Sequence, residues 1–142
     1  MEQKQLTVIP YLAFPGNCEE ALRVYMEAFG GEIFYLSRWS QENTSAPELM
    51  GKVMHVEFRL GRTPMAAGDA PEGAAASTAV KLMIHMDSKE EAERAVEALA
   101  KGGALLSPLK PHPKPDDGGC GSLIQDRFGF TWIITCPNPE AG

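Results

Sequence analysis

The chain has 142 residues and a mass of 15.4 kDa, the size of one compact domain or of two small modules that share a core. Hydrophobic residues make up 44% and charged residues 23%, an ordinary globular mixture that excludes a wholly disordered chain. With 13 Lys and Arg against 19 Asp and Glu, the formal net charge is -6. Because such a chain lacks the basic field that neutralises phosphates, we expect no nucleic-acid partner.

The N-terminal segment and the cysteines indicate the cellular compartment. Residues 1–6 are polar and have no signal-peptide pattern, and no apolar run approaches the roughly 18 residues that cross a bilayer. The cysteines Cys18, Cys120 and Cys136 show no C-x-x-C spacing, which favours reduced thiols over a disulfide framework or a zinc site. We therefore expect a cytoplasmic protein with no membrane partner.

The first half of the chain predicts a strand, a helix and three further strands. Residues 7–14 are apolar and β-prone, and a Pro-Gly-Asn turn ends them. Apolar residues then recur every three or four positions between Asn17 and Gly30, which predicts an amphipathic helix capped by Asn17. The other strands are expected at 32–39, 52–60 and 63–67, with a polar loop at 40–51.

The second half repeats this order. A strand is expected at 79–86, followed by a helix that begins at Asp87 or Ser88 and ends at Gly102. The segment 110–121 is rich in Pro and Gly and is predicted to be a loop, because these residues disfavour both ladders and helices. Strands are also expected at 104–109, 122–125 and 130–136.

The two halves also share residues at a nearly constant offset. Glu19-Glu20-Ala21 recurs as Glu90-Glu91-Ala92, and Arg59-Leu60-Gly61 recurs as Arg127-Phe128-Gly129. We infer an α+β fold of two tandem βαβββ modules with curved mixed sheets around a cavity, since each helix covers only one face of its sheet. The boundaries are module one at 7–69, a linker at 70–78, module two at 79–136 and a tail at 137–142.

Several segments resemble a known family. They are residues 10–14 (PYLAF), 15–22 (PGNCEEAL), 28–31 (AFGG), 52–58 (KVMHVEF) and 126–132 (DRFGFTW), together with Tyr25. The chain is similar to the vicinal oxygen chelate superfamily, the glyoxalase, bleomycin-resistance and dioxygenase fold. Within it the chain resembles the PhnB-like group, also labelled 3-demethylubiquinone 3-methyltransferase-like. This resemblance implies a glyoxalase-like fold, which does not by itself imply an activity.

The residues argue against the methyltransferase label. S-adenosylmethionine would usually lie over a Gly-rich turn between a strand and a helix of a parallel sheet, whereas the glycines here follow helices and mark hairpin turns. We expect no bound cofactor.

The resemblance also implies positions for a divalent metal on the first and last strands of each module. Aligned on the repeat, these positions are Ile9 or Pro10, Met65, Lys81 and Ile133. Aliphatic, thioether and protonated amine groups do not ligate such a metal. We therefore expect no metal centre of the usual kind.

Strand parity selects the candidate ligand-binding residues. Met83 and His85 are expected to face the cavity, and Tyr11 takes the matching position in module one. His85 is a candidate general base or anion ligand, and a purely structural histidine is the alternative. His55 and Glu57 share one face of their strand, which either belongs to the site or faces solvent or another subunit.

Two further groups are weaker candidates. Arg38, Trp39 and Asp69 stand at strand ends, where they either line an entrance or pack. His112 and Cys120 share one expected loop with two aspartates, a composition that can bind a metal.

Three functions remain open at this point. We favour a small-molecule-binding protein of the glyoxalase and bleomycin-resistance type, acting as a homodimer without the standard metal centre. One alternative is a metal-dependent isomerase, lyase or dioxygenase with non-standard ligands such as His55, Glu57 or His85. The other is a non-catalytic structural or regulatory dimer with a vestigial cavity.

Overall fold

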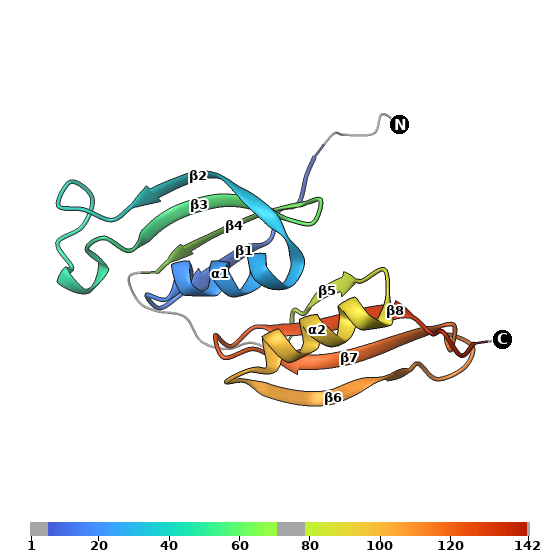
Figure 1. Ribbon diagram of the computed structural model, residues 1–142. Coiled ribbons are helices and arrows are strands. Elements are labelled where there is room, and N and C mark those ends of the chain that lie inside the picture. Colours follow the sequence, from blue (N-terminus) through green and yellow to red (C-terminus); the bar gives the residue numbers. More distant parts are fainter. Residues whose placement is uncertain (1–5, 71–78, 142) are drawn as a thin grey trace. The chain divides into compact units, whose positions relative to one another are not determined.

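The computed structural model describes residues 6–70 and 79–141, which form two compact units that are described separately (Figure 1). Each unit has the order strand, helix and three strands, as two βαβββ modules require. Except for Ala70, the linker predicted at 70–78 lies outside the described residues. The module boundaries and the cavity expected between the sheets therefore stay predictions.

Module one is a four-stranded mixed sheet with one helix. Its elements are β1 (Tyr11–Phe14), α1 (Cys18–Phe29), β2 (Gly31–Arg38), the short 3-10 helix η1 (Pro47–Leu49), β3 (Val53–Leu60) and β4 (Thr63–Asp69). The strand order is β1-β4-β3-β2, with β1 parallel to β4 and the other pairs antiparallel.

Module two has the same topology. Its elements are β5 (Leu82–His85), α2 (Lys89–Ala100), β6 (Ala104–Pro111), β7 (Gly119–Gln125) and β8 (Thr131–Pro137). The strand order is β5-β8-β7-β6, and β5 runs parallel to β8. The predicted α+β class and the two tandem mixed sheets are confirmed.

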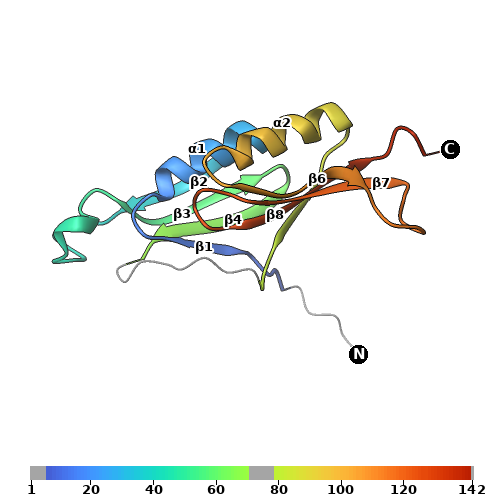
Figure 2. The same cartoon turned by 90° about the horizontal axis from the view of Figure 1, so that it is seen from below.

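Alternation along the strands explains why each sheet buries one face. In β3, Val56, Phe58 and Leu60 are buried while the residues between them are more exposed, and α1 lies across the buried side (Figure 2). In β8, Trp132 and Ile134 are buried in the same way under α2. Each sheet therefore has a covered face and a helix-free face.

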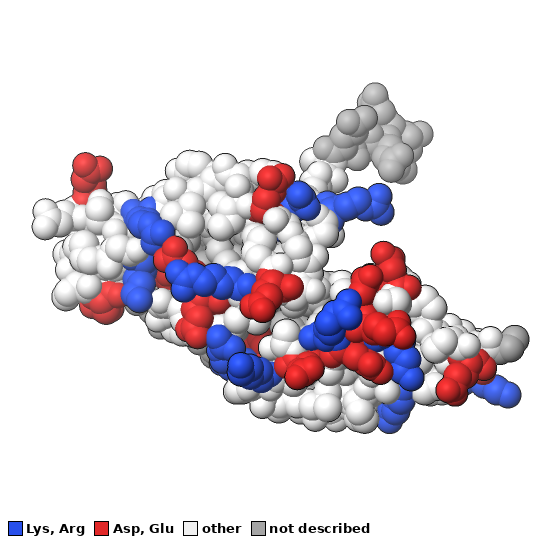
Figure 3. Space-filling view, in the orientation of Figure 1, with Lys and Arg blue, Asp and Glu red and all other residues white. Residues whose placement is uncertain are grey.

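The outer sides of the helices carry charges of both signs. Figure 3 shows acidic and basic side chains interspersed over the helices, where α1 presents Glu20, Arg23 and Glu27 and α2 presents Glu93 and Arg94. Such mixed charge is typical of a solvated helix face. No helix among the described residues has the length and apolarity that crossing a bilayer would require.

The loop predicted at 110–121 is wrong at both ends. β6 continues to Pro111 and β7 begins at Gly119, with Pro111 in register with Cys120. The proline is tolerated because β6 is the outermost strand of its sheet. On its outer side the described residues form no strand whose carbonyl oxygen would need the N–H that proline lacks. The strands predicted at 7–14 and 79–86 are shorter than expected, since β1 and β5 each pair with a single neighbour along four residues.

Candidate functional site

The helix-free face of module one presents a row of side chains across all four strands. Tyr11 on β1 is in register with Ala66 on β4, Ala66 with Glu57 on β3, and Glu57 with Tyr35 on β2. Neighbouring strands lie about 4.8 Å apart, so two tyrosines border the small side chain of Ala66 and the carboxylate of Glu57.

The imidazole of His55 lies between the two tyrosine rings. Its centroid is 5.9 Å from that of Tyr11 with the planes 19° apart, and 6.2 Å from that of Tyr35 with the planes 50° apart. Tyr11 is 54% exposed and Tyr35 52% exposed. These rings therefore form an aromatic surface that a ligand can reach, and such surfaces favour stacking with a planar group.

His55 and Glu57 form a pair on this face. Nε2 of His55 is 3.5 Å from Oε2 of Glu57, and both side chains are partly exposed. This distance suits an ion pair but is long for a hydrogen bond. The pair therefore offers an imidazole and a carboxylate side by side, a donor and an acceptor that can orient a ligand or move a proton.

Tyr11 keeps its position because of a glycine beneath it. A Cβ added to Gly68 would lie 2.5 Å from the Tyr11 hydroxyl and 2.5 Å from the Met54 carbonyl oxygen, so only glycine fits there. Burial raises the pKa of the Tyr11 hydroxyl, and Cys18 and Asp69 add to this effect. The phenol therefore stays neutral and can donate a hydrogen bond at neutral pH.

The helix-free face of module two carries the other candidates. Met83 and His85 on β5 are in register with Ile133 and Thr135 on β8. Met83 is 68% exposed, and Nδ1 of His85 lies 2.8 Å from Oγ1 of Thr135. The hydroxyl fixes the imidazole, so the second ring nitrogen of His85 remains available to a ligand.

The structure thus brings Tyr11, His55 and Glu57 together on one sheet. Met83 and His85 lie together on the sheet of the other module. All five residues face away from the helix of their own module, and their role in binding stays a prediction. Strand parity predicts this face for Tyr11, Met83 and His85, whereas for His55 and Glu57 it predicts only that they share one.

Sequence reasoning missed two residues of the first group. Tyr35 was not singled out because its face depends on an irregularity at Phe34, where the register of β2 against β3 shifts. Gly68 lies just beyond the strand predicted at 63–67, so the pattern gives it no place in the site. The one available signal was a glycine two residues after Ala66, on the same face of the strand, because a glycine within a strand often marks the close approach of another group.

The repeat alignment that assigns Met65 to the metal position of module one is wrong. Met65 pairs with Phe58, and both are buried on the side that α1 covers. The pair Tyr11–Ala66 corresponds to Met83–Ile133, so Ala66 holds the position that matches Ile133. Since neither alanine nor isoleucine ligates a cation, these positions do not fit the metal of the fold.

The described ranges also contain no cluster of three or more His, Cys, Asp or Glu side chains arranged to hold a metal ion. The expected grouping of His112 with Cys120 is not formed. Cys120 is buried beside Cys136 under α2, whereas His112 lies over Gly121 on the opposite face of the sheet. The reason is that Cys120 and Gly121 belong to a strand, where adjacent residues face opposite sides.

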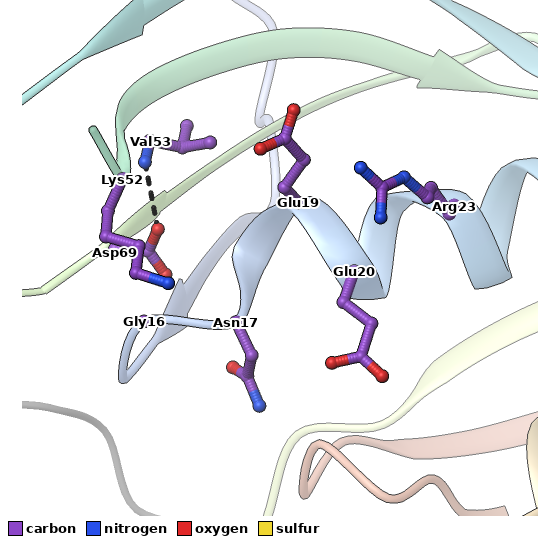
Figure 4. Close-up of a pocket in the computed structure, with 8 residues that line it drawn as sticks. All are labelled: Gly16, Asn17, Glu19, Glu20, Arg23, Lys52, Val53 and Asp69. Carbon is purple, nitrogen blue, oxygen red and sulfur yellow. Dashed lines mark hydrogen bonds between the residues drawn. The ribbon is translucent and has the colours of Figure 1, made fainter.

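A second polar feature lies at the N-terminus of α1. A pocket of about 260 Å³ there is lined by Gly16, Asn17, Glu19, Glu20, Arg23, Lys52, Val53 and Asp69 (Figure 4). Asp69 is only 3% exposed, and its two carboxylate oxygens accept the N–H groups of Cys18 and Val53, each at 3.0 Å. The carboxylate is therefore satisfied by backbone donors, which indicates a structural role.

Asn17 occupies the N-cap position of α1, as predicted, but its side chain does not cap the helix. Asn17 has φ -114° and ψ 26°, and its side chain makes no cap bond. A capping side chain needs an extended backbone to reach the helix N–H groups, and Asp69 supplies the acceptor instead.

Arg38 and Trp39 also have structural partners. Arg38 binds Glu19 through two nitrogens, at 3.1 and 2.8 Å, which lowers the pKa of the Glu19 carboxyl. Nε1 of Trp39 donates to the Asp69 carbonyl oxygen at 3.0 Å. These contacts fasten β2 and the loop after it to α1 and β4, so packing explains both residues.

Comparisons with known proteins agree with this architecture. A model of the family described as 3-demethylubiquinone-9 3-methyltransferase matches residues 6–135. Protein YjdN of Escherichia coli (strain K12) is 26% identical over an alignment of 137 residues, and the match covers 88% of this chain and 91% of that protein. The crystal structure of protein PA1353 from Pseudomonas aeruginosa is 31% identical with a TM-score of 0.79, and the match covers 94% of this chain and 98% of that one.

A more distant structure supports the fold alone. The glyoxylase/bleomycin resistance protein/dioxygenase domain from Frankia sp. EAN1pec is 14% identical with a TM-score of 0.66, over 96% of this chain and all of that one (100%).

Proposed function

The chain belongs to the 3-demethylubiquinone-9 3-methyltransferase family, within the glyoxalase/bleomycin resistance/dioxygenase structural superfamily, and we propose that it is a small-molecule-binding protein. The observation that carries this proposal is the exposed aromatic surface of Tyr11, Tyr35 and His55 on the helix-free face of module one. Free aromatic faces beside an accessible donor and acceptor are typical of sites that bind small organic molecules.

The ligand class follows from the same residues. A planar, conjugated or aromatic molecule would lie over Ala66, where the side chain is small, and stack against Tyr11 or Tyr35. The phenol of Tyr11 and the pair of His55 and Glu57 would hold its oxygen or nitrogen atoms by hydrogen bonds. Met83 and His85 are the corresponding contacts that we propose on module two.

The residues do not fit the cofactor that the family description implies. S-adenosylmethionine is usually held at a Gly-rich turn between a strand and a helix of a parallel sheet. The turn before α1 has one glycine and leads to the buried carboxylate of Asp69, and the turn before α2, residues 86–88, has none. We therefore derive no methyl-transfer step.

One observation favours a second candidate function. The contact of 3.5 Å between His55 and Glu57 lies on an accessible face, and an imidazole beside a carboxylate is a common general base. An enzyme of this kind would convert its ligand and not merely hold it. Turnover of a bound molecule, or stoichiometric metal in the purified protein, would favour this alternative.

The test is a thermal-shift screen of the full chain with metabolites and divalent metals, followed by titration calorimetry of each hit. Binding of a ligand at a concentration 100 times its dissociation constant stabilises the fold by about 2.7 kcal/mol, a readily measured shift. Tyr11→Ala and His55→Ala should weaken binding about tenfold or more and leave the unliganded melting temperature nearly unchanged, since both side chains are partly exposed.

Two variants make this test sharper. Gly68→Ala should weaken binding because it displaces the Tyr11 hydroxyl without removing it. Glu57→Ala should also weaken binding, and Glu27→Ala, which should not, is its matched control, because Glu27 is an exposed carboxylate on α1, on the other side of the sheet. Binding that persists unchanged in the Tyr11 and His55 variants would refute the proposed site.

We also propose that the protein is a cytoplasmic homodimer with no nucleic-acid partner. The acidic composition supports the absence of a nucleic-acid partner. Light scattering coupled to size exclusion tests the dimer, and a mass of one chain at micromolar concentration would refute it.

A further inference from the structure

The helix-free face of module two contains a hollow that the sites discussed above do not include. Its volume is about 290 Å³, and it lies beside the end of β6 and the beginning of β7. At about 30 Å³ for each water molecule in the liquid, this space corresponds to a ligand of about ten non-hydrogen atoms. Small-molecule sites begin near this size.

Strand register divides the floor of the hollow into two rows. The first row crosses the sheet from Met83, outside the hollow, through Ile133 and Leu123 to Ser107 inside it, and it is mainly apolar. Ile133 and Leu123 have the opposite parity to the residues buried under α2, so they face the hollow. This row can hold the hydrocarbon body of a ligand.

The second row is polar. It runs from His85 and Thr135, outside the hollow, to Gly121 and Lys110 inside it. The imidazole of His112 lies directly over Gly121, where a Cβ on that residue would collide with the ring. The backbone N–H of His112 also donates to the Gly119 carbonyl oxygen at 3.0 Å. The glycine thus makes room for the imidazole, and the backbone holds it there.

The ionisable side chains that line the hollow are all basic. Among the described residues that line it, Lys110 and His112 are the ionisable ones, and none of these lining residues carries a carboxylate. Within residues 6–70 and 79–141, Lys110 forms no ion pair. An ammonium group and an imidazole beside an apolar floor favour a negatively charged ligand group.

We propose that this hollow binds a small organic acid, with its apolar body on Leu123 and Ile133 and its anionic group between Lys110 and His112. This inference deepens the proposed function and rests on it, because it names the chemical class of ligand that module two accepts. Met83 and His85 extend the same two rows, so the hollow is continuous in register with the contacts already proposed on β5.

The experiment is titration of the full-length protein with phenylacetate, and with 2-phenylethanol as its uncharged analogue, followed by NMR. Phenylacetate should bind saturably and shift the resonances of Gly121, Leu123 and Ile133, whereas 2-phenylethanol should bind at least about threefold more weakly. Lys110→Gln should weaken phenylacetate binding about two- to fivefold, as expected for an exposed charge pair. The same variant should leave binding of 2-phenylethanol unchanged.

Matched variants separate the charge from other effects. Lys101→Gln also removes one exposed lysine, but outside the hollow, and it should leave both affinities unchanged. Addition of His112→Gln to Lys110→Gln should reduce the affinity for phenylacetate further. Circular dichroism verifies that each variant is folded.

Two results would overturn the inference. One is the absence of saturable phenylacetate binding up to 10 mM, because a dissociation constant above about 10 mM is too weak to assign to a specific site. The other is phenylacetate binding that shifts resonances of module one, or whose affinity is unchanged by the substitutions at Lys110 and His112. Either result would leave the proposed function standing if the metabolite screen finds a ligand that Tyr11→Ala weakens. A screen that finds no ligand at all would refute the proposed function itself.

Discussion

Asp69 caps a helix that begins 51 positions before it in the sequence, by accepting the backbone N–H of Cys18 at 3.0 Å. Its second carboxylate oxygen accepts the N–H of Val53 at the start of β3. One buried side chain on β4 therefore joins the first residues of α1 and β3. The pocket drawn in Figure 4 lies at this junction, and the carboxylate of Asp69 in its lining already accepts two backbone hydrogen bonds.

Asp69→Ala should lower the free energy of unfolding by about 2–4 kcal/mol, because it leaves two buried backbone donors without acceptors. Asn17→Ala, which removes the residue at the sequence position of the cap, should change it by less than about 0.5 kcal/mol, since Asn17 makes no cap bond. Urea denaturation measures both variants. Equal effects of the two substitutions would contradict the assignment of the cap to Asp69.

The buried thiol of Cys18 should lower the free energy of unfolding at alkaline pH. Burial raises the pKa of its thiol from 9.0 to about 12, with the charges of Asp69 and Glu19 adding to the effect. Below pH 9 the thiol is neutral in both states and stability is unaffected. Between about pH 9 and pH 12 the unfolded thiol loses its proton while the folded one keeps it, so stability falls by up to about 1.4 kcal/mol per pH unit.

The measurement is the free energy of unfolding against pH for the natural chain and for Cys18→Ala. Tyr11 and Cys136 also have raised pKa values and act in the same direction, so only the difference between the two curves reports Cys18. Parallel curves above pH 9 would show that the prediction is wrong.

The two tryptophans form a natural comparison. Nε1 of Trp132 donates to the buried carboxylate of Asp126 at 2.8 Å, and Nε1 of Trp39 donates to a carbonyl oxygen at 3.0 Å nearer the surface. Trp132→Phe should cost about 2–3 kcal/mol, because it removes a hydrogen bond to a buried charged group, and such bonds are stronger than those between neutral groups. Trp39→Phe should cost about 1 kcal/mol. Thermal denaturation distinguishes them, and the reverse order would count against the argument.

Gly103 should resist substitution. A Cβ there would overlap the Gln125 carbonyl oxygen and lie 2.9 Å from the Asp126 carbonyl carbon, so Gly103→Ala must move the backbone and should cost about 1–3 kcal/mol. Gly118→Ala is the control, because no atom lies within 4 Å of a Cβ at that position. It should leave stability within about 1 kcal/mol of the natural chain. Similar losses in both variants would mean that flexibility, and not crowding, explains Gly103.

Periodicity was enough to predict both helices and the number and order of the strands. The helical spacing after Asn17 and the alternation around Val56 each reflect burial on one side, which sequence records directly. The faces of Tyr11 and His85 followed from the same alternation, whereas for His55 and Glu57 it predicted only that the two share a face.

Register and remote contacts could not be predicted in this way. The repeat was aligned on Arg59-Leu60-Gly61 and Arg127-Phe128-Gly129, but Arg59 and Leu60 belong to β3 whereas Arg127 and Phe128 belong to the turn after β7. The hairpins therefore differ in loop length, with Leu60 opposite Thr63 and Gln125 opposite Thr131. An odd shift reverses the faces of a strand, which is why the repeat alignment selects Met65, and not Ala66, as the match of Ile133.

The two helices start by different means, and this has a consequence for how the chain is made. Ser88 bonds the N–H of Glu91 three residues later, so α2 carries its own starting signal. The acceptor for α1 arrives only with Asp69, after the other strands of that module have left the ribosome. A nascent chain halted before residue 69 would thus hold a poorly anchored first helix, whereas the later helix can begin as soon as its own first turn emerges.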